Sequence, residues 1–163
     1  MAVRHVLVPR TPEQVWSVLC DGNAYREWVV GTAESEELDD WPAVGSAIRY
    51  TVRIGPLRLH NETVVRISEP PRQLQLEARS GPLGSARIAI EVLPWGDDAL
   101  IILDEHPLSG PGGRLHNVAL DAVLQIRHRV MLQRLAKLVQ RSTGPGAAHG
   151  GEGRAAPADA GPW

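Results

Sequence analysis

The sequence predicts an α+β fold in which a curved antiparallel β-sheet wraps around one long C-terminal α-helix. Strand-like segments follow one another from about Ile48 to His106, and a single helical stretch, Arg114 to Arg141, closes the ordered part of the chain. Strands at such short spacing form antiparallel hairpins. A long helix that follows them packs on one face of the sheet, an arrangement that tends to enclose a cavity.

The N-terminal elements are a strand and a capped helix. Val3 to Val8 is rich in β-branched residues, as strands are. Thr11 supplies an N-cap, Pro12 fits the first helical position, and Gln14 completes a capping box, so we expect a helix that ends near Cys20. The next expected elements are a helical turn at Ala24–Trp28 and a strand near Val29–Glu37.

Alternation with a period of two runs through the middle of the chain and divides each strand into two faces. Turns at Gly55-Pro56, Pro70-Pro71 and Gly81-Pro82 separate the strands. The face that we expect to be buried carries Ile48, Tyr50, Val52 and Ile54, then Leu59, Asn61, Thr63, Val65 and Ile67, then Leu74, Leu76 and Ala78, then Ile88, Ile90 and Val92.

The last strand, Ala99 to His106, is apolar on both faces before it ends in an acid–base cluster. Asp104 and His106 share the side of Leu100 and Ile102, whereas Glu105 shares the side of Ile101 and Leu103. The pattern leaves open which side points inward. Asp104 and His106 could form an oriented general base, with the imidazole held by the acid, or a solvated pair of a kind common in sheets.

The final helix follows a hinge at Ser109 to Gly113, and its apolar stripe is not continuous. If Met131 and Leu135 face the sheet together with Leu124, then Asn117 and His128 point into the cavity. The alternative is a kink that leaves His128 solvated. In the first case a second apolar surface would remain for a homodimer contact or for cover from a loop, formed by Leu115, Ala119, Ala122 and Ile126.

Composition excludes several classes of function. A net charge of -2 without runs of like charge gives no reason to expect nucleic acid or an anionic membrane as a partner. No stretch approaches the roughly 20 apolar residues of a membrane span, and MAVRHVLVPR lacks the apolar core of a signal peptide, so a cytoplasmic protein is expected.

Cys20 is the single cysteine, which excludes an intrachain disulfide. The spacing of His60, His106, His116 and His128 matches no metal motif, and neither a metal nor a cofactor is expected.

Several segments together resemble the START-like, or SRPBCC, superfamily and its polyketide cyclase/dehydrase-like single-domain members. They are T-P-E-Q-V-W-S-V-L at Thr11–Leu19, the turn at Tyr25–Trp28, W-P-A-V-G-S at Trp41–Ser46, and L-Q-R-L-A-K-L in the last helix. The resemblance covers about residues 2 to 141. It implies a helix-grip fold for a domain of residues 1–142, with an apolar ligand in the tunnel between sheet and helix. Residues 143–163, rich in Gly, Ala and Pro, are expected to form a disordered tail.

Polar residues on the expected inner faces are the candidate ligand contacts. Tyr50, Asn61 and Thr63 lie on strands and must meet each other, water or a ligand if they are buried. Trp28 and Trp41 lie near one end of the tunnel in the family's layout, where they could line the ligand or plug the core. Asn117, Leu124, His128 and Met131 complete the candidate binding set from the last helix, and Asp104 and His106 are the candidate catalytic residues.

The leading hypothesis is binding or carriage of a small hydrophobic molecule, lipid-like or polyketide-like, because a cavity fold is expected and no convincing catalytic constellation is present. The second is a cofactor-independent cyclase/dehydratase that shapes a poly-ketone chain while His106, Asp104 or Tyr50 moves a proton. The third is a non-catalytic protein-interaction module with a filled core. The sequence does not choose among them.

Overall fold

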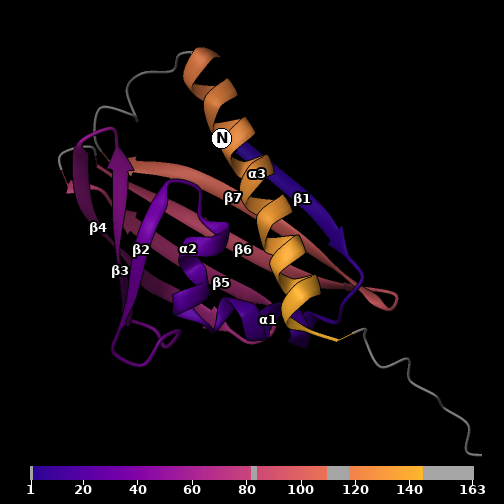
Figure 1. Ribbon diagram of the computed structural model, residues 1–163. Coiled ribbons are helices and arrows are strands. Elements are labelled where there is room, and N and C mark those ends of the chain that lie inside the picture. Colours follow the sequence, from indigo (N-terminus) through magenta and orange to yellow (C-terminus); the bar gives the residue numbers. More distant parts are fainter. Residues whose placement is uncertain (1, 82–83, 110–117, 145–163) are drawn as a thin grey trace, which may run out of the picture.

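The computed structural model describes residues 2–81, 84–109 and 118–144, and it confirms the predicted α+β class. In chain order the elements are β1 (Ala2–Val8), α1 (Pro12–Leu19), the 3₁₀ turn η1 (Gly22–Ala24), α2 (Tyr25–Trp28), β2 (Thr32–Leu38), β3 (Ala47–Ile54), β4 (Leu57–Glu69), β5 (Gln73–Arg79), β6 (Ser85–Trp95), β7 (Asp98–Ser109) and α3 (Val118–Ser142). The strands form one curved antiparallel sheet in the order β1-β7-β6-β5-β4-β3-β2 (Figure 1).

The order of the sheet places the first strand beside the last one. β1 pairs with β7, so β1 and β2 lie at opposite edges although they are consecutive strands in the chain. The segment α1–η1–α2 spans the distance between these edges. The long helix α3 crosses in front of the sheet and contacts β1, β7, α1 and α2 (Figure 1). Among the described residues, no helix is both long enough and apolar enough to cross a bilayer.

The predicted capping box at α1 is confirmed. The backbone N–H of Gln14 donates to Thr11 Oγ1 at 3.3 Å, and the backbone N–H of Thr11 donates to Gln14 Oε1 at 3.0 Å. These two bonds satisfy backbone donors that the first helical turn leaves without partners. The cap orients the helix so that Val15, Val18 and Leu19 lie in the core.

The predicted inner faces are confirmed on β3, β5 and β6, where Ile48, Leu76 and Ile90 are fully buried. On β4 the alternation is interrupted by a bulge between Val65 and Ile67. The extra residue reverses the phase, so Ser68, not Ile67, pairs with the inward-facing Leu74. The placement of Ile67 on the inner face was therefore wrong.

The ends of three elements differ from the predictions or lie beyond the described residues. β2 begins at Thr32 because the Val29 amide still bonds to Tyr25 O and ends the preceding helix. β7 continues to Ser109, three residues beyond the expected end, so the predicted hinge begins inside a strand. The rest of that hinge, the predicted helix start at 114–117, and the predicted tail from 145 onward lie outside the described residues.

Helix α3 is oriented as in the first of the two predicted arrangements, in which Met131, Leu135 and His128 face the sheet. Met131 and Leu135 are 1% exposed and His128 is completely buried, so the alternative with a solvated His128 is wrong. Ile126, on the other side, is 65% exposed. Of the proposed dimer surface, only Ile126 has a described side chain, because Leu115, Ala119 and Ala122 lie outside that set.

Replacing the cap should weaken the fold by a small and defined amount. We expect Thr11→Ala to lower the free energy of unfolding by about 1 kcal/mol, because one amide of α1 loses its acceptor. Thr11→Ser keeps the hydroxyl and should stay within about 0.3 kcal/mol of the natural protein. Urea denaturation measures both, and an equal loss in the two variants would show that the hydroxyl does not cap the helix.

Candidate functional site

Glu105 is a carboxylate on the inner face of the sheet. It follows Ile101 and Leu103 on the same side of β7, and these two residues are 0% and 1% exposed. The Glu105 side chain itself is only 11% exposed. The question that alternation left open for β7 is therefore answered: the side that carries Glu105 faces α3.

Two neighbouring residues of α3 bind this carboxylate. His128 Nε2 lies 2.5 Å from Glu105 Oε2, and Arg127 Nη1 lies 3.0 Å from Oε2 and 3.2 Å from Oε1. Because an ionised carboxylate only accepts hydrogen bonds, Nε2 of His128 carries the shared hydrogen. Within the described part of the chain, the buried Nδ1 of His128 has no hydrogen-bond partner.

The surroundings keep Glu105 ionised. Burial by itself raises the pKa of this carboxyl group, but the His128 hydrogen bond and the charge of Arg127 outweigh burial and hold the pKa below its ordinary value. A buried charge without such partners would cost several kcal/mol, on the order of 3–5 kcal/mol. Glu105 is thus a fixed negative charge between the sheet and the helix.

A group of buried hydroxyls lies on the same inner surface. Tyr25, from α2, and Thr63, from β4, are hydrogen-bonded at 3.1 Å between Tyr25 Oη and Thr63 Oγ1. The ring of Tyr50 lies 5.6 Å from that of Tyr25, centroid to centroid. Burial raises the pKa of Tyr25 far above its ordinary value and also raises the pKa of Tyr50, and the charges of Glu105 and Arg127 act on both rings. The two tyrosines are therefore neutral hydroxyl groups.

The two predicted tryptophans pack around the same tyrosine. The ring of Trp28 lies 5.3 Å from Tyr25 and that of Trp41 lies 6.5 Å away, both edge-on. Trp28 is 3% exposed, and Trp41 Nε1 donates to Leu19 O at 3.1 Å. These contacts make an aromatic cluster around the ring of Tyr25.

The exposure of inner-face side chains changes from one row of paired residues across β7, β6 and β5 to the next. In the row of Leu103, Ile90 and Leu74 every side chain is at most 1% exposed. Glu105 belongs to the next row. In the row beyond it, Ala86 and Ala78 are only half-buried, whereas Thr63 and Ile48, farther along the same row, are completely buried. Glu105 therefore lies between inner-face side chains that are fully buried, in the row of Leu103, and the half-buried side chains of Ala86 and Ala78.

The remaining predicted contacts share this surface where the structure describes them. Asn61 is half-buried and pairs with Tyr50 across β3 and β4. Met131 lies one helical turn after His128 and is 1% exposed. Asn117 and the side chain of Leu124 lie outside the described residues.

The candidate catalytic pair, Asp104 and His106, lies on the opposite face of β7. His106 Nδ1 is 3.0 Å from Asp104 Oδ2, so the predicted contact between them is formed. Arg87 of β6 approaches the same carboxylate at 3.7 Å. All three side chains are partly exposed on the outer surface, away from Glu105.

Sequence reasoning therefore missed Glu105 and Arg127. A usable clue was present, since a histidine placed on the apolar stripe of α3 needs a polar partner from the facing strand, and Glu105 shares the more completely apolar side of β7. In the described residues, no three His, Cys, Asp or Glu side chains are grouped as metal ligands.

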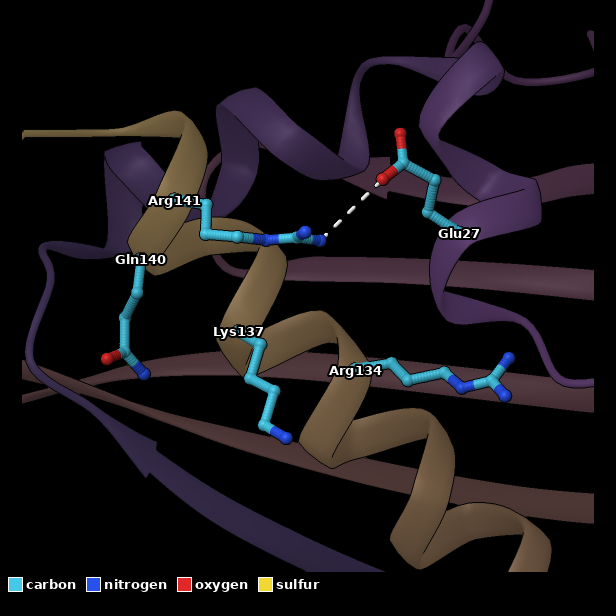
Figure 2. Close-up of a pocket in the computed structure, with 5 residues that line it drawn as sticks. All are labelled: Glu27, Arg134, Lys137, Gln140 and Arg141. Atoms are coloured by element: carbon cyan, nitrogen blue, oxygen red, sulfur yellow. Dashed lines mark ion pairs between the residues drawn. The ribbon is translucent and has the colours of Figure 1, made fainter.

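A separate depression of about 380 Å³ lies on the outside, between α2 and the end of α3. Figure 2 shows its lining, in which Arg134, Lys137 and Gln140 project from α3 and Arg141 reaches toward Glu27 at 3.7 Å. The residues that line this depression are all polar or charged.

The fold is shared with several solved structures at low sequence identity. The aromatase/cyclase ZhuI from Streptomyces sp. R1128 is 15% identical with a TM-score of 0.65, over 86% of this chain and 93% of that one. Protein TTHA0849 from Thermus thermophilus is 13% identical with a TM-score of 0.66, over 88% and 99%. Protein CV1439 from Chromobacterium violaceum is 17% identical with a TM-score of 0.63, over 85% and 96%. These likenesses show the fold, which is of the helix-grip type.

A search of curated proteins found no match. The model of the family described as "Polyketide cyclase / dehydrase and lipid transport" matches residues 2–140. The family and the fold support a ligand-binding or cyclase-type role. The chain therefore belongs to the polyketide cyclase/dehydrase and lipid-transport family of the START-like, or SRPBCC, superfamily.

Proposed function

We propose that this protein binds a small hydrophobic molecule, lipid-like or polyketide-like, between the inner face of the sheet and α3. The observation that carries the proposal is the change in burial across the inner face. Apolar side chains are fully covered in the row of Leu103 and Ile90, and they become half-buried at Ala78 and Ala86, with Glu105 between. A molecule seated there would cover apolar surface and meet polar groups.

The residues around this place support the proposal. Aliphatic side chains of β5 and β6 form the floor, and the aromatic group around Tyr25 forms a wall. Covering roughly 200 Å² of apolar surface would stabilise a complex by about 5 kcal/mol before the costs of association. The hydroxyl groups of Tyr50 and Thr63 can orient the molecule without carrying charge.

Binding can be tested with prodan, an uncharged naphthalene ketone whose emission shifts to the blue in apolar surroundings. We expect prodan to bind the natural protein with a blue shift. Ala78→Phe, which places a ring on the half-buried inner face of β5, should weaken binding at least about tenfold, equal to about 1.4 kcal/mol. A fluorescence titration measures the dissociation constants.

The matched control is Gln75→Phe, which adds the same ring to the outer face of the same strand. We expect Gln75→Phe to bind prodan like the natural protein, and circular dichroism should show both variants folded. Equal weakening in the two variants would mean that the probe does not sit on the inner face, and no blue shift at all would overturn the proposal.

A cyclase-type activity is the second candidate, because a carboxylate and an imidazole are in contact inside the fold at Glu105 and His128. Cyclisation of a poly-ketone chain requires removal of a proton from a carbon between two carbonyl groups. Two places could supply the base: the inner pair, or the outer pair of Asp104 and His106, whose catalytic role stays a prediction.

Proton removal can be followed as deuterium exchange at the central carbon of 1-(2-naphthyl)butane-1,3-dione by NMR. We expect no acceleration over buffer, because a lowered pKa makes Glu105 a weak base. An acceleration lost in Glu105→Gln would assign catalysis to the inner pair. An acceleration lost in His106→Ala would assign it to the outer pair. Either result would replace carriage by catalysis as the leading function.

The Glu105 cluster also predicts how stability responds to acid. The pKa of Glu105 is lower in the folded than in the unfolded chain, so its contribution is complete above the unfolded-state value of about 4.3 and is lost as the pH falls through the folded-state value. We expect Glu105→Gln to be less stable by about 2–3 kcal/mol at pH 7, and the difference to shrink below about pH 4.

Urea denaturation at a series of pH values measures this difference. Glu36→Gln, on the exposed side of β2, serves as the control and should change the free energy of unfolding by less than about 0.5 kcal/mol throughout. A constant gap between the natural protein and Glu105→Gln from pH 7 to pH 3 would contradict the assignment.

A further inference from the structure

We infer that the interior site selects apolar molecules that carry a neutral hydrogen-bond donor, such as a phenolic or alcoholic hydroxyl, and disfavours apolar carboxylates. Glu105 is the residue that determines this specificity. The inference rests on the proposed function, since it names the chemical class that the same site would take.

The first step is the number of hydrogen bonds that Glu105 can still accept. An ionised carboxylate has about four lone-pair positions. Among the described residues, its donors are His128 Nε2 and Arg127 Nη1, and both belong to α3. With these donors alone, and within the part of the chain that the structure describes, acceptor capacity remains on the carboxylate, whose side chain keeps 11% exposure.

The second step is the charge state of that acceptor. The two partners from α3 hold the pKa of Glu105 below its ordinary value, so the group remains negative at neutral pH. A negative acceptor in a poorly solvated place forms a strong hydrogen bond with a donor. It repels a second carboxylate, which would have to lose its hydration beside a like charge.

The third step concerns the other polar groups of the interior. The hydroxyls of Tyr25 and Tyr50 stay protonated because burial raises their pKa values, and Tyr25 is already bonded to Thr63. These neutral hydroxyls carry no positive charge that would offset the repulsion between Glu105 and a bound carboxylate. Arg127 does carry a positive charge, with a side chain 30% exposed, but its Nη1 is bound to Glu105.

Four probes of one shape separate these contributions. They are 2-naphthol, which donates and accepts; 2-methoxynaphthalene, which only accepts; 2-methylnaphthalene, which does neither; and 2-naphthoate, which is negative at pH 7. We expect 2-naphthol to displace prodan from the full chain at roughly tenfold or more lower concentration than each of the other three, as a hydrogen bond to a charged group implies.

The variant Glu105→Gln should reduce the preference for 2-naphthol over 2-methoxynaphthalene to about threefold or less, because the acceptor is no longer charged. It should also bring 2-naphthoate closer to 2-methylnaphthalene. His60→Ala, on the exposed outer side of β4, is the control that should leave the order of the probes unchanged. Should Glu105→Gln fail to fold, the order of the four probes on the natural protein alone still decides.

The outcomes distinguish a failure of this inference from a failure of the proposed binding function. If prodan does not bind, the proposed function fails. If prodan binds and the four probes displace it equally, or 2-naphthoate is the strongest competitor, the function stands and the specificity for donors is overturned. If 2-naphthoate is the strongest competitor, Arg127 would be the residue that determines the specificity.

Discussion

The Glu105 carboxylate joins the last strand of the sheet to the long helix through Arg127 and His128. Both donors come from consecutive positions of α3, and a helix can aim two such residues at one carboxylate in only one rotation about its axis. That rotation turns Met131 and Leu135 toward the sheet and leaves Ile126 exposed. The buried ion cluster and the apolar face of the helix therefore depend on each other, since a slip of one residue would bury a charge without its partner.

Strand β7 carries two acid–base pairs, and the faces of the strand give them different surroundings. Glu105 faces α3 and is almost fully buried, whereas Asp104 and His106 lie on the outer surface beside Arg87. The Glu105 side chain keeps 11% exposure, whereas Asp104 and His106 keep 22% and 26%, so solvent screens a charge less on the inner face than on the outer face. The inner pair places a negative charge between the sheet and α3, while the outer pair lies on the partly exposed outer surface.

Local patterns predicted most of the fold because helix caps and strand faces are determined by residues that are close together in the sequence. The capping box at Thr11 and Gln14 and the period-two faces of β3, β5 and β6 depend on neighbouring residues, and the structure contains them. The bulge before Ile67 could not be predicted, since an extra residue in one strand is visible only through its pairing with the next. The inward side of β7 was undecided for a similar reason. Both sides are apolar, one more completely than the other, and the partner residues on α3 settle which one faces inward.

The pairing of Glu105 also bears on the choice between carriage and catalysis. A general base works best when its pKa lies near the working pH, which for a carboxyl group requires burial without compensating charge. Here burial acts in that direction, but the hydrogen bond from His128 and the charge of Arg127 reverse its effect. The interactions that hold the helix on the sheet thus weaken Glu105 as a base and strengthen it as a permanent acceptor. An interior built in this way is better suited to recognising a hydroxyl group than to removing a proton from carbon.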